Sequence, residues 1–283
     1  MQKNNGLDKN QLISFVIFSA ILMAFMFYFQ NKQSDEKQVA DAKAKTEQKV
    51  ASKTIANNIN ATVNAAAIKN VTVKNKELTL EFASLGGQLS SVEINQYKAY
   101  NAKTDKHDLP LYLIEKNNSS YGFQFKDKTG KTFNTKDLVF VPSVKDNTVT
   151  MTAQVSGATI QYVYKLLDNY TLDFNVKTQG LSSIVTDEKA DFHWNYTVRG
   201  MEKGRSQEQT HSEFNYAFDN YGSTDYDTNG FEEPEETLNW LAVKQQFFTS
   251  IIESTNGFTH AKGTQETIEK GKKKKKFNFD GQV

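Results

Sequence analysis

The chain has 283 residues, and its 34 lysine and arginine side chains against 33 aspartate and glutamate side chains leave a formal net charge of +1. This length is sufficient for one large domain or two small ones. The balanced charge argues against a nucleic-acid-binding protein, because nothing indicates a basic face that would displace counterions from phosphates. The absence of cysteine excludes disulfides, thiolate nucleophiles, cysteine-based metal sites and a lipidated N-terminal cysteine.

The first notable segment is an apolar run at residues 12–29, which contains no charged residue, proline or glycine. At about 1.5 Å per residue, a helix of this length spans roughly the hydrocarbon thickness of a bilayer. Polar residues follow it directly, whereas a cleavable signal peptide, the alternative, would end in small residues. We therefore predict a retained transmembrane anchor. Its apolar residues include Leu12, Phe15, Ile17, Ile21, Leu22, Phe25 and Phe29.

The segment 30–67 is rich in lysine, glutamine, alanine, aspartate and asparagine. It cannot bury enough surface to offset its ordering entropy, so we predict a solvated linker. A coiled coil is the alternative, but no apolar heptad persists. The small positive excess before residue 12 favours a cytoplasmic N-terminus, which would place the chain after about residue 30 across the membrane. The predicted organisation is thus an anchored N-terminal segment 1–29, a linker 30–67 and a domain 68–283.

From Val71 onward the hydrophobic period changes to two, which is typical of half-buried strands. Clusters of turn-forming residues separate the runs, and no helices of the kind needed between parallel strands are evident. We therefore predict an all-β fold with an antiparallel sandwich or barrel. The pattern of Trp240–Ile252 alone fits either a helix or a strand. The alternating runs are 71–73, 78–82, 121–125, 149–151, 159–164, 170–176 and 192–198.

Two segments resemble the large periplasmic domain of YidC-type membrane protein insertases. The first, Phe82–Ile94, reads as a strand, a glycine turn that tolerates positive φ, and a second strand. The second is Trp240–Ile252, where the family places a strand, and we predict a strand there too. The motif residues are Phe82, Gly86, Gly87, Val92, Tyr97, Trp240, Phe247 and Phe248. The anchor, the low-complexity linker and the β domain also follow the family's order, in its Bacteroidetes form.

The resemblance implies a β-supersandwich of the galactose-mutarotase type, anchored in the inner membrane and facing the periplasm. It implies the N-terminal part of an insertase that helps insert and fold inner-membrane proteins, alone or with the Sec translocon. The implied partners are inner-membrane lipid, Sec components and nascent membrane proteins, without nucleic acid, cofactor or enzymatic activity.

In the family, the insertion machinery is a later domain of five transmembrane helices. No second apolar run of 18 residues follows Phe29. The segment Phe277–Val283 resembles a strand and turn inside the β domain. We therefore expect a sandwich without its final strands, with an open edge or an exposed core face, and no insertase activity in this chain alone.

The four histidines, His107, His193, His211 and His260, have no metal-ligand spacing. His193 lies between two aromatic residues in a predicted strand and therefore points to the opposite face. This leaves open a membrane-tethered, mutarotase-like enzyme acting on a sugar, which would need His193 in a pocket near a carboxylate. An ordinary strand histidine is the expected alternative. A third alternative is an envelope binding protein unrelated to insertion.

Three further segments carry unusual composition. We expect the acidic cluster Glu232–Glu236 to be a solvated loop, because it lacks the ligand spacing of an EF-hand. We expect the basic run Lys272–Lys276 to be a solvated hairpin or a frayed tail instead of a lipid-binding patch. For Arg199–Phe231, a long binding loop and a strand pair with aromatic cross-strand contacts are equally favoured.

Overall fold

The computed structural model describes residues 69–283 except 187–188, 219–224, 228–229, 234 and 269–273. The described residues belong to the second of two units, Ala56–Val283. The predicted anchor at residues 12–29 and the predicted linker at 30–67 lie outside the described residues. In the part that the structure describes, no helix has both the length and the apolar character needed to cross a membrane.

The first sheet has the order β1-β2-β3-β4, with antiparallel pairing throughout. Its alternation is confirmed, since Leu78, Leu80 and Phe82 are buried while the residues between them are half-buried. The predicted glycine turn joins β2 to β3, with Gly86 and Gly87 at φ values of 76° and 62°. The strands are β1 (Val71–Lys74), β2 (Leu78–Phe82), β3 (Leu89–Asn101) and β4 (Lys106–Ile114).

The second sheet has the order β10-β9-β8-β7, again antiparallel. Asp146 has a φ of 51° between β7 and β8, and Asn169 has a φ of 85° between β9 and β10. Aspartate and asparagine, which are turn-forming residues, therefore separate these strands, in keeping with the clusters that the sequence shows between its alternating runs. The strands are β7 (Val141–Lys145), β8 (Thr148–Val155), β9 (Ala158–Leu166) and β10 (Leu172–Gln179).

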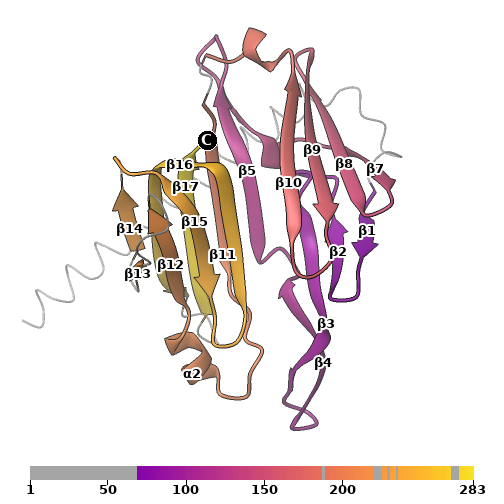
Figure 1. Ribbon diagram of the computed structural model, residues 1–283, viewed down its shortest axis with the longest axis vertical. Coiled ribbons are helices and arrows are strands. Elements are labelled where there is room, and N and C mark those ends of the chain that lie inside the picture. The colour runs from indigo at the N-terminus through magenta and orange to yellow at the C-terminus, as the bar shows by residue number, and fades with distance from the viewer. Residues whose placement is uncertain (1–68, 187–188, 219–224, 228–229, 234, 269–273) are drawn as a thin grey trace, which may run out of the picture. The chain divides into compact units, whose positions relative to one another are not determined.

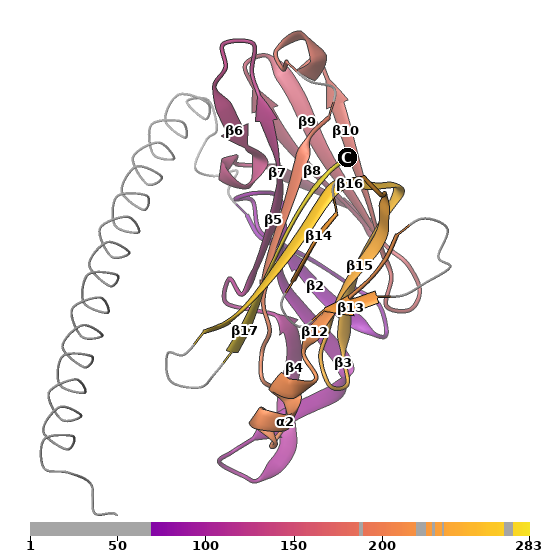
Figure 2. The same cartoon turned by 90° about the vertical axis from the view of Figure 1, so that its left-hand side faces the viewer.

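The third sheet has nine strands in the described residues, with the order β13-β12-β15-β16-β17-β11-β5-β6 and β14 paired to β16. The N-terminal part of β16 pairs with β15, and its C-terminal part pairs with β14 and β17 (Figure 2). The strands are β5 (Ser119–Lys126), β6 (Thr132–Asn134), β11 (Asp191–Thr197), β12 (Glu213–Phe218), β13 (Asp225–Asp227), β14 (Gly230–Glu233), β15 (Leu238–Lys244), β16 (Thr249–Ile268) and β17 (Lys274–Gln282).

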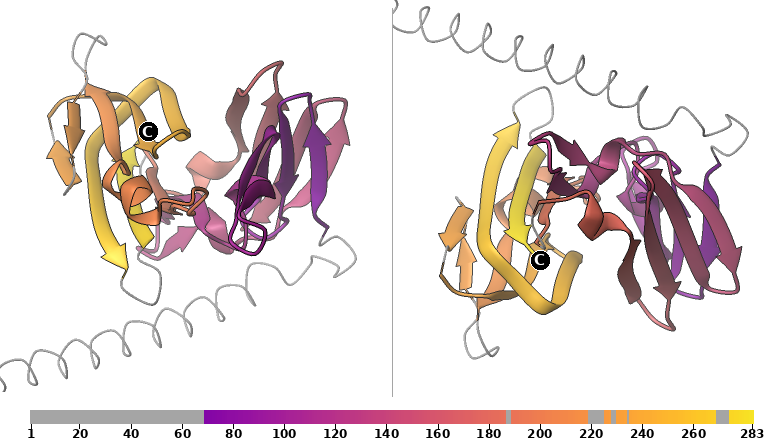
Figure 3. Two further views of the ribbon diagram at one scale, coloured as in Figure 1. Left: turned by 90° about the horizontal axis from the view of Figure 1, so that it is seen from below. Right: turned by 90° about the horizontal axis from the view of Figure 1, so that it is seen from above.

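Helical structure is limited to short segments in the described part of the chain. These are the 3-10 turns η2 (Thr135–Asp137) and η3 (Leu181–Ser183) and the α-helix α2 (Arg205–Thr210). The prediction of a nearly all-β, antiparallel fold is therefore confirmed. In Figures 1 and 3, β1–β4 and β7–β10 lie together on one side, and the later strands β12–β17 group on the other.

The prediction of a strand at Trp240–Ile252 is correct only in part. The segment forms the end of β15, a turn at 245–248 and the start of β16, and Gln245 N–H donates to the Phe248 carbonyl across that turn at 2.8 Å. The chain therefore reverses where one continuous strand was expected. As a result Phe247 is at the tip of a hairpin, with 67% of its surface exposed.

Of the two expectations for the basic run, a solvated hairpin or a frayed tail, the described residues fit the hairpin, although Lys275 is partly buried instead of solvated. Residues 274–276 begin β17, which is paired with both β16 and β11. Lys275 shares the strand face of Phe277 and Phe279, both buried, and its Nζ donates to the Ser212 carbonyl at 2.7 Å. Partial burial lowers the pKa of Lys275. The alternation of the strand therefore determines where this lysine lies. Because β17 pairs on both sides, its residues up to Gln282 belong to an internal strand and not to the open edge expected near Phe277–Val283.

Of the two interpretations of Arg199–Phe231, the described residues support the strand pair. β12 pairs with β13, and the segment also contains α2. The Phe231 ring on β14 contacts three aromatic rings of β12, closest at 4.2 Å between the centroids of Phe231 and Tyr216.

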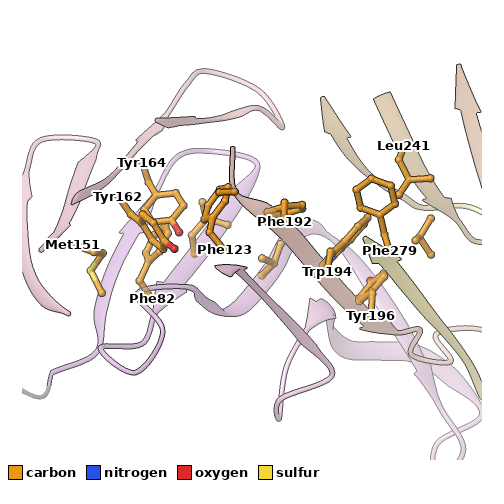
Figure 4. Packing of buried hydrophobic residues seen from close by; sticks show 14 of the residues in the cluster. Phe82, Phe123, Met151, Tyr162, Tyr164, Phe192, Trp194, Tyr196, Leu241 and Phe279 are labelled. Atoms are coloured by element: carbon orange, nitrogen blue, oxygen red, sulfur yellow. The ribbon is translucent and has the colours of Figure 1, made fainter. Parts of the chain in front are cut away.

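The hydrophobic core is continuous across the sheets (Figure 4). Phe82 of β2 packs on Tyr164 of β9 with ring centroids 4.7 Å apart. Phe123 of β5 joins this group through Tyr162, at 5.9 Å, and extends it to Phe192 of β11, at 5.2 Å. Aromatic packing of this kind therefore connects all three sheets.

Candidate binding groove

A groove of about 860 Å³ is lined by residues of all three sheets. Strands β2 and β3 contribute mainly aliphatic side chains, and β5, β10 and β11 contribute mainly aromatic ones. The β15–β16 hairpin contributes residues 247–252. Large apolar concave surfaces of this kind are characteristic ligand sites. Representative lining residues are Leu80, Val92, Tyr121, Phe174, Trp194 and Ile252.

A chain of hydroxyl and backbone groups connects all three sheets at the base of the groove. The Tyr164 hydroxyl donates to the Gly87 carbonyl at 2.9 Å and lies 2.8 Å from the Tyr121 hydroxyl. Since Tyr164 has only one hydroxyl proton, Tyr121 is the donor in the second bond. Tyr121 in turn accepts the Leu89 N–H at 3.1 Å. Burial raises the pKa of Tyr121 to about 12 and raises the pKa of Tyr164 as well, so both phenols stay neutral near pH 7.

The mouth of the groove exposes large apolar and aromatic side chains. Ile251 is 63% exposed, Tyr170 51% and Tyr97 50%, and all three line the groove together with Phe247. Tyr97 contacts Phe248 edge to face, with ring centroids 5.5 Å apart, and so links β3 to the β15–β16 hairpin. Contiguous exposed apolar surface of this kind is typical of an interaction site.

The lysine, histidine and glutamate of the lining come from the β3–β4 hairpin and the segment before α2. They are Lys98, His107 and Glu202, and His107 Nε2 lies 3.1 Å from Glu202 Oε2. The Tyr100 N–H donates to the Met201 carbonyl at 2.7 Å, which holds the two segments together. The rest of the lining is uncharged. The groove therefore matches an occupant that is largely uncharged.

His193 points away from its neighbours Phe192 and Trp194, as predicted, and does not line the groove. Its Nδ1 contacts the Asp280 carboxylate on the adjacent strand β17. Its Nε2 is buried and has no hydrogen-bond partner among the described residues. The carboxylate that the enzyme alternative requires is thus present, but on the sheet face opposite the aromatic row that lines the groove.

The other predicted histidines have separate surroundings. His107 pairs with Glu202, His211 Nε2 lies 2.9 Å from Gln207 Nε2 on α2, and His260 is exposed on β16. The described residues contain no group of three or more histidine, aspartate or glutamate side chains that could hold a metal ion.

In the acidic cluster 232–236, Glu232 forms an exposed ion pair with Lys262, with Oε2 and Nζ 2.7 Å apart. In the basic run 272–276, Lys276 Nζ lies 3.1 Å from Glu266 Oε1. Both contacts join neighbouring strands, β14 with β16 and β16 with β17. Exposed pairs of this kind contribute little to stability.

Residues 70–279 match the family model of the YidC periplasmic domain. The chain belongs to the YidC family. It is 28% identical over 295 residues to the membrane protein insertase YidC of Phocaeicola vulgatus, covering 94% of this chain and 46% of that protein. It is 25% identical over 318 residues to the membrane protein insertase YidC of Parabacteroides distasonis, covering 98% of this chain and 49% of that protein. The chain thus spans about half the length of the curated relatives it matches.

Among solved structures, the chain is similar to a galactose mutarotase-like protein from Lactobacillus casei, with a TM-score of 0.44 and 12% sequence identity over 75% of this chain and 87% of that chain. It is also similar to a galactose mutarotase related enzyme from Lactobacillus acidophilus, with a TM-score of 0.43 and 10% sequence identity over 75% of this chain and 85% of that chain.

The motif residues predicted from the YidC resemblance fall into two groups. Phe82 is buried in the core and does not line the groove, whereas Val92, Tyr97, Phe247 and Phe248 line it, Val92 as a buried side chain. Sequence reasoning found these residues but not the groove itself, because its walls come from strands far apart in the chain. The available signal was the two pairs of consecutive apolar residues, Phe247-Phe248 and Ile251-Ile252, because a half-buried strand would alternate apolar with polar residues.

Proposed function

We propose that this chain supplies the extracytoplasmic β domain of a membrane protein insertase and that its groove binds apolar segments of nascent membrane proteins. The observation that carries the proposal is the open, largely uncharged groove in a member of the YidC family. Burial of apolar surface in such a groove favours binding and opposes the entropy cost of association and of ordering the bound segment. Binding of this kind needs no catalytic group, and the proposed role is not enzymatic.

We also propose the finer organisation that the sequence predicts. Residues 12–29 anchor the chain in the inner membrane as a single pass, residues 30–67 form the linker, and residues 68–283 form a periplasmic β-supersandwich. The uncharged run of 18 residues supports the anchor. Membrane lipid and nascent chains are the proposed partners, and the Sec translocon is a further one that delivers such chains.

A second candidate function is that of a sugar-active, mutarotase-like enzyme. It is favoured by one observation, the contact between His193 and the Asp280 carboxylate, which provides the elements of an acid–base pair. Polarimetry with galactose tests it directly. Accelerated mutarotation that is lost in His193→Ala would support the enzyme, and a rate equal to that of buffer would exclude this activity.

Site-specific photo-crosslinking tests the first proposal. A photoreactive amino acid replaces Ile251 at the mouth of the groove or, as a matched control, Leu85, which is 57% exposed and does not line the groove. The full chain is expressed in cells, and membranes are irradiated in the presence of a stalled, membrane-inserting nascent chain. We expect crosslinks from position 251 and none from position 85. Equal crosslinking from both positions, or none from 251, would contradict the proposal.

A further inference from the structure

In the described part of the chain, β10 forms one end of the β7–β10 sheet. The Leu167 N–H donates to the Thr171 carbonyl, so these two residues form a hydrogen-bonded pair next to the β9–β10 turn. From this pair onward, non-hydrogen-bonded and hydrogen-bonded pairs alternate along β9 and β10. Leu172, Phe174 and Val176 therefore belong to non-hydrogen-bonded pairs, and their backbone N–H and C=O groups point away from β9. This edge offers a row of backbone donors and acceptors for another strand.

The same strand forms a wall of the groove. The side chains of Leu172 and Phe174 line it, and the Phe174 ring stacks on Tyr164 with centroids 4.6 Å apart and an interplanar angle of 8°. Successive side chains of a strand point to opposite faces. A strand added beside β10 would consequently direct every second side chain into the groove and the others away from it.

The distribution of charge determines the chemistry of the occupant. The lining residues Tyr121 and Tyr164 pack against Phe174 of β10, with ring centroids 6.0 Å and 4.6 Å from that of Phe174. The lysine, histidine and glutamate of the lining, Lys98, His107 and Glu202, come from the β3–β4 hairpin and the segment before α2. A charged side chain directed toward Tyr121 would be desolvated without a partner, which is unfavourable. Alternate uncharged, apolar side chains match this lining. Such side chains are abundant in the membrane-spanning segments of nascent membrane proteins.

We propose that a segment of a nascent membrane protein binds in extended form as an additional strand on the free edge of β10, with its alternate apolar side chains in the groove. The inference rests on the proposed function and adds the binding mode to it. Backbone hydrogen bonds to β10 supply affinity that is independent of the client's sequence, and the groove selects for apolar side chains at every second position. Clients of unrelated sequence would thus share one site.

Two peptides of identical side-chain sequence test the binding mode. The first is an uncharged peptide of about eight residues with alternating valine and threonine, matched to the 8 residues of β10. The second has N-methyl groups on alternate amides, so that it cannot donate to the strand edge. The full chain is placed in lipid nanodiscs, because detergent would compete for an apolar groove. We expect the methylated peptide to bind at least tenfold more weakly by fluorescence anisotropy.

Two proline variants test the edge from the side of the protein. Val176→Pro removes an outward-facing N–H of β10, and an edge position tolerates proline because no ladder bond is lost. Val144→Pro is the control on the opposite edge, β7. The Leu166 N–H donates to the Asn147 carbonyl, so residues 147 and 166 form a hydrogen-bonded pair between β8 and β9. Pairs alternate along the strands, so the backbone groups of Val149 also point toward β9. Val144, the partner of Val149 on β7, therefore belongs to a non-hydrogen-bonded pair, and its backbone groups face outward. We expect at least tenfold weaker peptide binding in Val176→Pro and unchanged binding in Val144→Pro.

Hydrogen exchange provides a readout that does not depend on the variants. We expect the unmodified peptide to protect the amides of Phe174 and Val176 and the methylated peptide to leave them exchanging. Equal binding of both peptides, or unchanged amide exchange on binding, would overturn strand addition. If strand addition fails in either way but nascent chains still crosslink to position 251, the proposed function stands and only the binding mode is wrong. Protection of these amides without any crosslink to nascent chains would support strand addition and contradict the proposed function.

Discussion

The hydroxyl groups of Tyr121 and Tyr164 lie 2.8 Å apart and join β5 of the nine-stranded sheet to β9 of the β7–β10 sheet. Through the Gly87 carbonyl and the Leu89 N–H, the same two groups also hold the β2–β3 turn. The base of the groove therefore depends on one hydrogen-bonded chain that involves all three sheets.

Tyr164→Phe removes one hydroxyl from this chain and leaves both the Gly87 carbonyl and the Tyr121 hydroxyl without that partner. Leaving buried polar groups unpaired costs about 1–3 kcal/mol, so we expect the free energy of unfolding in urea to fall by that amount. The double variant, which combines Tyr164→Phe with Tyr121→Phe, removes both hydroxyls. Its loss in free energy of unfolding should be smaller than the sum of the losses in the two single variants. Strictly additive losses would show that the hydroxyls do not act as a chain.

Gly87→Ala tests the packing of the glycine turn. Gly87 has a φ of 62°, and an added Cβ would approach the Phe140 ring to 2.7 Å. The control Gly130→Ala also has a positive φ, 85°, but its Cβ would meet nothing within 4 Å. Both changes carry a backbone cost of about 1–2 kcal/mol, and overpacking adds roughly 1–3 kcal/mol at Gly87 alone. Urea unfolding should separate the two variants. Equal losses would mean that Phe140 shifts without cost.

The buried tyrosines predict a loss of stability at high pH. Burial raises the pKa of Tyr121 and of Tyr196 to about 12, above the ordinary value of 10.0. Between these values the unfolded chain releases protons that the folded chain retains, so the free energy of unfolding should fall as the pH rises from 10 to 12. Urea unfolding across that range measures the effect. The decline should be smaller in Tyr121→Phe, and an equal decline in this variant would contradict the assignment.

The sequence is sufficient to predict most strands because their signal is local. Leu78, Leu80 and Phe82 alternate with polar residues, and that alternation by itself specifies a strand with one buried face. The turn at 245–248 was missed for the converse reason, since its residues are two glutamines and two phenylalanines with no glycine, proline, asparagine or aspartate to indicate a reversal.

The groove is not predictable in the same way. Its walls combine Leu80, Phe174 and Ile252, whose proximity follows from the pairing of distant strands and not from any local pattern. His193 illustrates the same limit. Its orientation follows from alternation, but its Asp280 partner depends on the register between β11 and β17.

Binding of apolar segments in the groove is tested by measuring the affinity of an uncharged, apolar fluorescent peptide for the full chain in lipid nanodiscs. The comparison is between the unaltered chain, Ile251→Glu in the groove and Leu85→Glu outside it. A carboxylate at position 251 faces apolar lining, whereas position 85 is comparably exposed elsewhere. We expect at least tenfold weaker binding in Ile251→Glu and unchanged binding in Leu85→Glu. Equal affinities in all three proteins would contradict binding in the groove.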